Sequence, residues 1–503
     1  MNRSGPIRRI VICGGGSAGW MTAAALAKML GDHGPRIVLV ESDEIGTVGV
    51  GEATIPPIVQ FNAMLGIDES EFVRETQATF KLGIEFVDWH RLGARYMHPF
   101  GQFGADMNET SFVHFWLRAV SLGLSPDLAP FSVETKAAQQ QLFSPRAGNR
   151  PDGAKIFYAY QFDASAYAAF LRRFAERLGV ERIEGRIDRV DVNREDGFID
   201  SVVLADGRTI EGDLFIDCSG FRALLIGEAM GEPYEDWSRL LPANRAIAVP
   251  SKRVSDPLPY TRSTAREAGW QWHIPLQHRT GNGYVFCDAF LSEDEATRLL
   301  LERLEGDPLA DPRVLRFTTG RRRGWVRNCV SIGLSSGFLE PLESTSIHLI
   351  QVAINSLLTL FPDRSCKASL GDRHNRKMDD LTVGIRDFIM AHYCITERDD
   401  TEFWRHCRSM ELPDSLREKI ELFRSRGEVL ASSSDLFKEV NWTALFIGQG
   451  VHPSAWHPLA DAMSERDLRH NMQLISATIA GRLMDMPKHS DLLQRIAASD
   501  SRN

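Results

Sequence analysis

The stretch Arg9-Ile10-Val11-Ile12-Cys13-Gly14-Gly15-Gly16-Ser17-Ala18-Gly19 decides the fold of this chain. Its first five residues form an apolar run with the length of a buried strand, and three glycines in the pattern Gly-x-Gly-x-x-Gly follow at once. Residues 20–30 are rich in alanine and predict a helix, and residues 36–41 (RIVLVE) predict a second strand. Residues 8–41 therefore predict one βαβ unit of a parallel sheet that is covered on both faces.

The glycine spacing is that of a dinucleotide-binding loop, although a purely structural turn is the alternative. The first glycine permits a tight turn, the second lets the backbone approach a pyrophosphate, and the third lets helix and strand pack closely. The helix offers free N–H groups and the positive end of its dipole to phosphates. Glu41 ends the second strand, where a carboxylate can accept hydrogen bonds from a ribose. The loop residues expected to contact the cofactor are Gly14, Gly16, Ser17, Ala18 and Gly19.

Two further glycine-rich turns favour FAD over NAD(P), which binds to the same kind of loop. Residues 49–54 (GVGEAT) come just after the second strand, and residues 333–337 (GLSSG) follow a late apolar strand at 329–332. A late glycine turn that returns to the cofactor is typical of large FAD monooxygenase folds. Taken singly, each turn can also be a plain loop. The cofactor-contacting candidates in these turns are Gly49, Val50, Gly51, Glu52, Ala53, Thr54, Gly333 and Leu334.

Composition excludes several classes of protein. A chain of 503 residues with 43% hydrophobic and 25% charged residues is ordinary for a globular protein, and a net charge of −9 does not suit nucleic-acid binding. The seven cysteines contain no CxxC pair, so neither a disulfide framework nor a metal site is expected. No apolar run is long enough to span a bilayer. The N-terminal apolar segment runs directly into the glycine loop, unlike a signal peptide, so we expect a cytoplasmic protein without a membrane partner.

The hexapeptide Trp270-Gln271-Trp272-His273-Ile274-Pro275 is the second informative stretch. In an extended segment two tryptophans two residues apart point to the same side. Pro275 ends or edges the strand because proline cannot donate a ladder hydrogen bond. The result is a rigid aromatic wall, which taken alone is more often part of a core than a functional feature.

The remaining patterns complete an α/β architecture. Helical patterns cover residues 70–90, α/β patterns residues 155–217, an antiparallel sheet residues 240–290, and helices most of the chain after Pro341, with a loose tail at 490–503. We expect an FAD-dependent monooxygenase-like fold: a Rossmann-type domain and an antiparallel sheet, followed by a mainly helical C-terminal part. Residues 1–345 are assigned to the FAD-binding part, interleaved with substrate-site segments near 80–100 and 240–290, and residues 346–503 to a substrate-binding part.

The chain resembles the flavin-dependent tryptophan halogenases. The matching segments occur in the family's order and are residues 14–21, 49–56, 270–275 and 340–345 (EPLEST). The resemblance implies that reduced FAD and O2 oxidise a halide ion to hypohalous acid, which then halogenates an electron-rich aromatic such as indole. It also implies a two-component system, in which a separate NAD(P)H-dependent reductase supplies reduced FAD by diffusion. The resemblance leaves open whether the protein forms a homodimer.

The resemblance assigns the chemistry to three side chains. Lys81 receives the hypohalous acid, Glu343 stabilises the cationic ring and accepts its proton, and Ser344 contacts the acid or the lysine. From the residues alone, a lysine in a helical stretch is usually solvated, although Phe80 and Leu82 favour a desolvated amine with a lowered pKa. Lys81 can present the halogen in two ways, as a haloamine or as a protonated lysine that binds hypohalous acid, and the sequence does not separate them. Glu340 and Glu343 have the spacing of neighbours on a helical turn.

By resemblance, the halide lies against the backbone N–H groups of Thr345 and Ser346. Many relatives have glycine where this chain has Ser346, so bromide is expected to be used at least as well as chloride. The resemblance places Trp270, Trp272 and Pro275 on the flavin side of a tunnel. Their task there is to keep the organic substrate away from the flavin, so that hydroxylation does not compete.

The substrate pocket departs from the family pattern. His98 and Phe100 match the aromatic sandwich for indole, and Asn441 matches a substrate-contacting asparagine; a surface histidine and a helix cap are the alternatives. Tryptophan-specific members grip the amino-acid end of their substrate with a tyrosine pair and an acidic run. Residues 423–440 contain no tyrosine here and are shortened. We therefore expect a more open site that takes simple indoles or a larger, carrier-linked substrate.

Two other functions compete with this interpretation. An FAD-dependent aromatic monooxygenase would hydroxylate its substrate directly and would not depend on halide. A flavin-binding protein without halogenating chemistry is the third reading, and the presence of both Lys81 and Glu343 argues against it.

Overall fold

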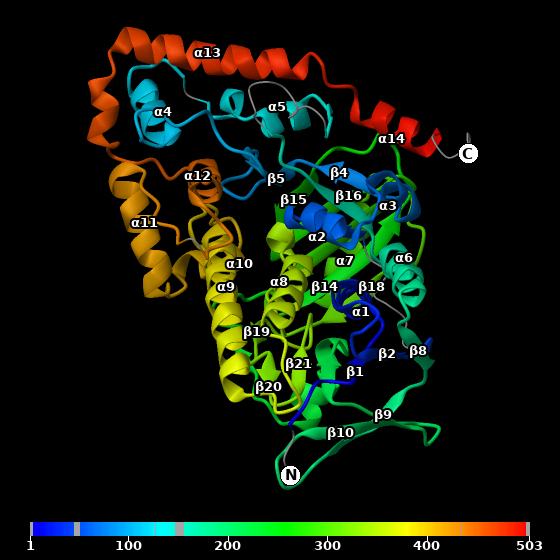
Figure 1. The fold of residues 1–503 in the computed structure, drawn as a ribbon. Coiled ribbons are helices and arrows are strands. Elements are labelled where there is room, and N and C mark those ends of the chain that lie inside the picture. The colour runs from blue at the N-terminus through cyan, green and yellow to red at the C-terminus, as the bar shows by residue number, and fades with distance from the viewer. Residues whose placement is uncertain (1–3, 45–50, 126, 146–154, 433, 499–503) are drawn as a thin grey trace. The chain divides into compact units, whose positions relative to one another are not determined.

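The computed structural model describes residues 4–44, 51–125, 127–145, 155–432 and 434–498. The chain divides into two compact units, each assembled from three segments that are far apart in the sequence (Figure 1). Unit 1 comprises Met1–Gln77, Phe162–Asn244 and Arg316–Thr382, and unit 2 comprises Ala78–Gln161, Arg245–Leu315 and Val383–Asn503. The assignment of residues 1–345 to the cofactor and 346–503 to the substrate stays a prediction.

A six-stranded sheet forms the centre of unit 1, and the predicted βαβ segment lies in it. β1 (Arg9–Cys13) is parallel to β2 (Arg36–Glu41) on one side and to β12 (Leu214–Asp217) on the other. The other strands are β8 (Glu181–Glu184), β21 (Cys329–Ser331) and β20 (Trp325–Val326), in the order β20-β21-β12-β1-β2-β8. Only the β20–β21 pair is antiparallel within this sheet. The apolar runs leave β1, β2 and β12 buried, as expected for parallel strands covered on both faces.

Helices pack around the loop at the end of β1. α1 (Ser17–Leu30) begins in the glycine loop and packs against α6 (Ala164–Arg177) and α8 (Ser346–Thr359). The other elements of this unit are α2 (Pro57–Leu65), α3 (Glu69–Glu75), β3 (Gly51–Ala53), β9 (Ile187–Val192), β10 (Ile199–Leu204), β11 (Thr209–Glu211), β13 (Glu235–Asp236), β19 (Gly320–Arg321) and β22 (Gly337–Phe338). β9, β10 and β11 form a separate antiparallel sheet.

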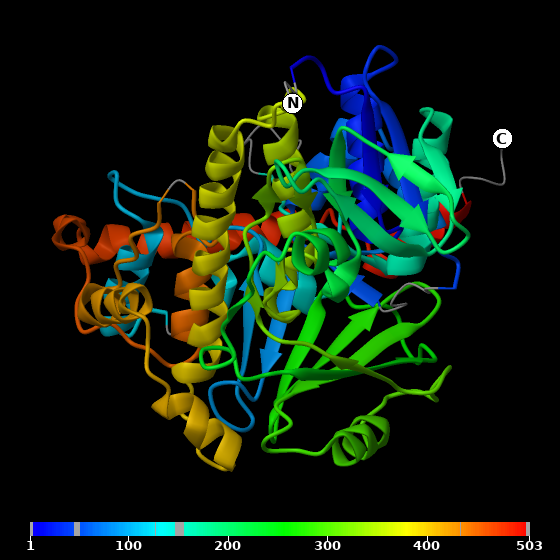
Figure 2. The same ribbon diagram turned by 90° about the horizontal axis from the view of Figure 1, so that it is seen from below.

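Unit 2 contains the antiparallel sheet that the sequence predicts for residues 240–290. Its order is β18-β14-β17-β16-β15-β5-β6. The pairs from β14 to β15 and the pair β5–β6 are antiparallel, whereas β15 and β5 run parallel. The bounds are β5 (Gly83–Val87), β6 (Arg95–Pro99), β14 (Arg245–Ser251), β15 (Thr261–Arg266), β16 (Gly269–Pro275), β17 (Thr280–Phe286) and β18 (Arg313–Arg316). Figure 2 shows these strands side by side, with α7 (Glu293–Glu302) against β14 and β17. A short pair, β4 (Thr79–Lys81) with β7 (Ala159–Asp163), adds to this unit.

Helices make up most of the chain after residue 345, as predicted. α9 (Ala368–Cys394) starts in unit 1 and ends in unit 2. The helices of unit 2 include α4 (Phe112–Ser121), α5 (Val133–Gln139), α10 (Glu402–Ser409), α11 (Asp414–Arg426), α12 (Glu439–Gly448), α13 (Glu465–Leu483) and α14 (His489–Ala498). The expected loose tail is thus helical as far as residue 498. Within the described ranges no helix is long and apolar enough to cross a membrane.

The helical prediction for residues 70–90 is wrong beyond residue 75. α3 ends at Glu75, and the chain continues as β4 and β5. Phe80, Leu82, Ile84 and Phe86 recur at every second position, which is the period of a strand. That alternation, visible in the sequence, outweighs the helical spacing that precedes it.

Candidate active site

The glycine loop of unit 1 has the geometry of a phosphate-binding turn. Gly14 has φ of 113°, and a Cβ there would lie 2.3 Å from the carbonyl oxygen of Cys218. A Cβ on Gly19 would lie 1.8 Å from the carbonyl oxygen of Gly14, so both positions need glycine. A Cβ on Gly16 would meet no atom within 4 Å. The open side of Gly16 at the start of α1 leaves room for a pyrophosphate, so this loop fits a dinucleotide.

Glu41 is held in place by residues that sequence reasoning missed. Its Oε1 accepts a hydrogen bond from Nε of Arg182 at 2.6 Å. Its Oε2 lies 1.5 Å from the position that a Cβ of Gly15 would take. The middle glycine of the loop is therefore required by the Glu41 carboxylate. Arg182, on β8, also pairs with Asp43 and Glu184. Burial lowers the pKa of its guanidinium, but the hydrogen bond and charge of Glu41, with the charges of Asp43 and Glu184, outweigh burial and raise it.

The late glycine turn does return to the first loop. Gly333 has φ of 85°, and a Cβ on it would lie 2.8 Å from Cβ of Ala18. Leu334 follows it in the same turn. In the earlier turn, Gly51–Ala53 form β3, and Thr54 is buried. Burial raises the pKa of Glu52 to about 7, and Gly49 and Val50 lie outside the described residues.

The segment 340–346 has an unusual backbone. Glu340, Glu343 and Ser344 have φ values of 116°, 67° and 57°, which are rare for residues other than glycine. These angles rule out the regular helical turn expected for Glu340 and Glu343. Both glutamates are buried, with Glu343 only 2% exposed. Strained backbone of this kind persists where the surrounding structure enforces it, and it clusters at functional sites.

Thr345 and Ser346 lie where this strained segment becomes helix α8. Thr345 is the N-cap residue, and its side chain makes no capping hydrogen bond. Ser346 is the first helical residue. The first N–H groups of a helix have no partner within it, and they carry the positive end of the helix dipole. This end of α8 is therefore suited to an anion.

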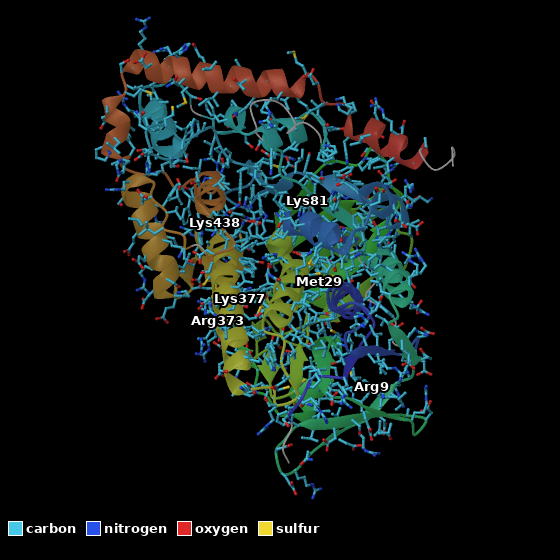
Figure 3. The ribbon with its side chains drawn as sticks, viewed as in Figure 1. Arg9, Met29, Lys81, Arg373, Lys377 and Lys438 are labelled. Atoms are coloured by element: carbon cyan, nitrogen blue, oxygen red, sulfur yellow. The ribbon has the colours of Figure 1, made fainter. Side chains whose placement is uncertain are left out.

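Lys81 lies on β4 of unit 2 (Figure 3) and is 0% exposed. Its Nζ lies 5.3 Å from the centre of the Phe100 ring. The backbone N–H of Phe100 donates to the carbonyl of Leu82 at 3.0 Å, which attaches the Phe100 loop to the lysine segment. Lys81, expected to be the catalytic lysine, and Phe100, expected to contact the substrate, therefore lie next to each other.

The tryptophan hexapeptide forms a strand, as predicted, in which Pro275 is the last residue of β16. The ring centres of Trp270 and Trp272 are 6.1 Å apart, so both side chains lie on one side. The Trp272 ring covers Gly283 on β17, where a Cβ would lie 2.0 Å from a ring carbon. The absence of a side chain at Gly283 therefore makes room for the Trp272 ring.

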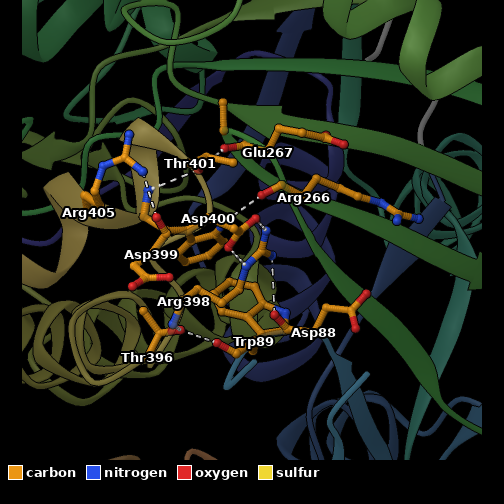
Figure 4. Close-up of polar contacts among 12 residues, drawn as sticks. Asp88, Trp89, Arg266, Glu267, Thr396, Arg398, Asp399, Asp400, Thr401 and Arg405 are labelled. Atoms are coloured by element: carbon orange, nitrogen blue, oxygen red, sulfur yellow. Dashed lines mark hydrogen bonds and ion pairs between the residues drawn. The ribbon is translucent and has the colours of Figure 1, made fainter. Parts of the chain in front are cut away.

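A polar network surrounds Trp89 and Arg398 and includes Arg266 and Glu267 (Figure 4). The ring of Trp89 lies 6.4 Å from that of Trp270, and its Nε1 donates to the carbonyl of Ser263. Trp404 packs on Trp89 and donates to the carbonyl of Arg266 at 2.7 Å. Arg398, which is nearly fully buried, stacks on Trp404 at 4.8 Å. The turn between β15 and β16 is thereby anchored, which makes the wall rigid.

Of the three residues expected around the substrate, His98 and Asn441 lie together in an aromatic cluster, whereas the contact given for Phe100 is with Lys81. His98 lies at the end of β6, and its Nε2 is 3.0 Å from Nδ2 of Asn441. Oδ1 of Asn441 accepts a hydrogen bond from the backbone N–H of Lys438 at 2.7 Å, so Asn441 also caps α12. Phe388 and Phe437 stack with ring centres 3.7 Å apart, beside His98. Sequence reasoning missed Phe388, because nothing local links α9 to residues 437–441.

The comparison with protein families decides the identity of the chain. The tryptophan halogenase family matches residues 9–465. This chain belongs to the tryptophan halogenase family. RebH, the tryptophan 7-halogenase of Lentzea aerocolonigenes, is 40% identical over 491 residues, which cover 90% of this chain and 92% of RebH.

Solved halogenase structures agree with this assignment over nearly the whole chain. The flavin-dependent halogenase Xcc4156 of Xanthomonas campestris is 48% identical, with a TM-score of 0.95 and coverage of 98% of this chain and 99% of that one. The flavin-dependent halogenase BrvH of Brevundimonas sp. BAL3 is 44% identical, with a TM-score of 0.93 and coverage of 97% and 99%. The predicted family, fold class and enzyme class are confirmed: the chain is a flavin-dependent halogenase, which implies FAD as its cofactor.

In this halogenase the segment 423–440, which lacks tyrosine, is tied to α4. Oε2 of Glu428 lies 3.6 Å from Nε2 of His114, and burial lowers the pKa of that histidine. At the other end, the hydroxyl of Ser111 donates to Oε1 of Glu439. These acidic residues of the segment thus have protein partners already.

Proposed function

We propose that this halogenase uses hypohalous acid, presented by Lys81, to halogenate indole or an indole derivative. The observation that carries the proposal is the complete burial of Lys81 beside the ring of Phe100, 5.3 Å from Nζ. A lysine is almost never fully buried unless its charge is paired or its amine has a task. Burial of Lys81 argues against the solvated lysine that its sequence context alone favours, and an amine held beside an aromatic ring suits the proposed role.

The chemistry is divided among named groups. Bound reduced FAD supplies, with O2, the two-electron oxidation of a halide to hypohalous acid. The backbone N–H groups of Thr345 and Ser346 hold the halide at the start of α8, whose open N-terminus supports this role. Trp270, Trp272 and Pro275 keep the organic substrate away from the flavin.

Lys81 presents the halogen either by donating a hydrogen bond to the oxygen of hypohalous acid or as a haloamine. In the first case a ring carbon bonds to the halogen, the oxygen–halogen bond breaks, and the departing hydroxide leaves as water with the proton that Lys81 donates. Glu343 stabilises the cationic ring and accepts the proton that the ring carbon loses. Ser344 contacts the hypohalous acid or the lysine. The strained backbone at Glu343 and Ser344 supports these roles.

The aromatic cluster around His98 supports an aromatic substrate. His98 packs beside Phe388, which stacks with Phe437, and an indole ring can bind by packing against such rings. Asn441 is engaged by Lys438 and His98, and Glu428 by His114. Asn441 and Glu428 are thus already bonded within the protein, and the segment 423–440 has no tyrosine with which to grip the amino-acid end of tryptophan. A simple indole is therefore favoured over free tryptophan.

We propose bromide as the preferred halide, because bromide is more easily oxidised than chloride and because the Ser346 hydroxyl can add a hydrogen-bond donor to the halide loop. We also propose that a separate NAD(P)H-dependent reductase supplies reduced FAD by diffusion. The chain has a single Gly-x-Gly-x-x-Gly loop, and FAD takes it.

The test is a grid of reactions with reduced FAD, in which indole or tryptophan is combined with bromide, chloride or no halide. Haloindole should form fastest with bromide, and no product should form without halide. Turnover of tryptophan but not of indole contradicts the substrate proposal. A hydroxylated product formed without halide supports the aromatic monooxygenase instead.

A further inference from the structure

A chain of buried hydrogen bonds connects the strand of Lys81 to the tryptophan wall. The hydroxyl of Thr261 donates to Oε1 of Gln161 at 3.0 Å, and Nε2 of Gln161 donates to the hydroxyl of Thr79 at 3.1 Å. The hydroxyl of Thr79 in turn donates to the carbonyl of Pro275 at 2.7 Å. Every donor in this chain points the same way, and it ends on the last residue of the hexapeptide.

The short strand β4 needs such support because it is an edge strand. Within unit 2 it pairs with β7 alone, over the three residues 79–81. Two backbone N–H groups of this segment bond to groups outside the sheet: that of Phe80 donates to Nε2 of His489, and that of Leu82 donates to the carbonyl of Pro259. Side chains and irregular backbone thus replace the second neighbouring strand that a central strand would have.

Thr79 lies two residues before Lys81 on the same strand. Side chains two residues apart on a strand project from the same face, so Thr79 and Lys81 leave β4 on one side. Thr79 is 0% exposed, as is Gln161, so water does not replace a lost bond easily. The bond from Thr79 to Pro275 therefore sets the rotation of β4 about its own axis, and with it the direction of Lys81.

We propose that Thr79 is a positioning residue for Lys81, which it holds in register with the tryptophan wall through Pro275 and Gln161. The proposal rests on the proposed role of Lys81 as the amine that presents the halogen. Without the Thr79 hydroxyl, Nζ of Lys81 loses its fixed direction, and hypohalous acid escapes before it reaches the ring.

Two substitutions at one position test this. Thr79→Val keeps the shape but removes the hydroxyl, whereas Thr79→Ser keeps the hydroxyl. Haloindole formation, FAD affinity, and capture of escaped oxidant by a soluble β-diketone are measured for both. Thr79→Val should lower kcat by about 10- to 100-fold, the usual effect of a misplacement near 1 Å, with unchanged FAD affinity and more captured oxidant. Thr79→Ser should stay close to wild type. Equal activity of Thr79→Val and wild type, or equal losses in both variants, overturns the proposal.

A crystal structure of Thr79→Val separates this proposal from the proposed function. A displaced Nζ of Lys81 in a protein that halogenates nothing means that Thr79 positions the lysine while the proposed function fails. An unmoved Nζ overturns the positioning role, whatever the activity. If Thr79→Val does not fold, Thr261→Val is used instead, because it removes the first hydrogen bond of the series. More oxidant should then escape than in wild type, although less than in Thr79→Val. A wild-type ratio of captured oxidant to haloindole in Thr261→Val overturns the proposal.

Discussion

The Nε2 atom of His489 accepts a hydrogen bond from the backbone N–H of Phe80, the residue before Lys81, at 3.1 Å. Nδ1 of the same ring lies 2.8 Å from the carbonyl of Pro257, to which it donates in the neutral tautomer. The histidine is 1% exposed and packs its edge on the Phe80 ring. The first residue of the last helix, α14, thus supports the strand of the proposed catalytic lysine.

This contact predicts a stability that depends on pH. Burial lowers the pKa of His489 to about 4 from an ordinary value of 6.5. A lowered histidine pKa means that its contribution is fully present above pH 6.5 and is lost as the pH falls toward 4. The protein should lose up to about 3 kcal/mol over this interval through His489. Urea unfolding at several pH values checks this.

His489→Gln should be less stable than wild type at pH 7.5 and should lose less stability on acidification. The exposed His470, on α13, provides the control. His470→Gln should keep the wild-type dependence on pH. If His489→Gln follows the same pH curve as wild type, the buried histidine is not the group that titrates.

Replacement of the lysine should remove halogenation and leave the cofactor bound. Lys81→Ala is expected to reduce product formation by at least about 100-fold, since the group that presents the halogen is gone. FAD affinity should not change, because the dinucleotide loops lie in unit 1. Lys252, an exposed lysine of unit 2, gives the control Lys252→Ala, which should remain active. Near-normal halogenation by Lys81→Ala contradicts the mechanism.

Arg182 should govern FAD affinity through Glu41. In Arg182→Ala the Glu41 carboxylate loses its partner at 2.6 Å and keeps the nearby carboxylates of Asp43 and Glu184. A hydrogen bond between charged groups contributes about 1.5–3 kcal/mol, so the Kd of FAD should rise by about 10-fold or more. Titration of flavin fluorescence measures this.

Arg189→Ala, which breaks an exposed pair with Asp191, is the control and should bind FAD normally. A ribose-specific effect is recognised by comparing ADP with 2′-deoxy-ADP: wild type should prefer ADP, and Arg182→Ala should lose the preference. Equal loss for both nucleotides points to a general change in the loop instead.

Phe437 should affect how the aromatic substrate binds. Phe437→Ala removes the stack with Phe388, whose ring centre lies at 3.7 Å. Aromatic pairs contribute about 0.5–1.5 kcal/mol beyond burial, so KM for indole should rise by about 2- to 10-fold, with a smaller change in kcat. Leu430→Ala, at an exposed position of the same segment, should have no such effect. An unchanged KM in Phe437→Ala would place the indole elsewhere.

Local patterns predicted much of this protein, and their failures have identifiable causes. The βαβ unit, the antiparallel sheet and the late helices follow from periodicity and glycine spacing over short windows. The stretch from Thr79 to Val87 forms strands because its apolar residues alternate, although a helical pattern leads into it. The segment 340–344 departs from a helix through backbone angles that tertiary packing imposes on non-glycine residues.

The sequence by itself determined the dinucleotide loop, the tryptophan strand and the family, because each is written in residues that are adjacent or nearly so. Tertiary structure alone decided which partners hold the key side chains. Arg182 and Glu41 are 141 residues apart, Thr79 and Pro275 are 196 apart, and Phe80 and His489 are 409 apart. No local periodicity predicts such pairs, because each forms only when segments far apart in the sequence pack together. Packing buries their polar groups, and buried polar groups need hydrogen-bond partners.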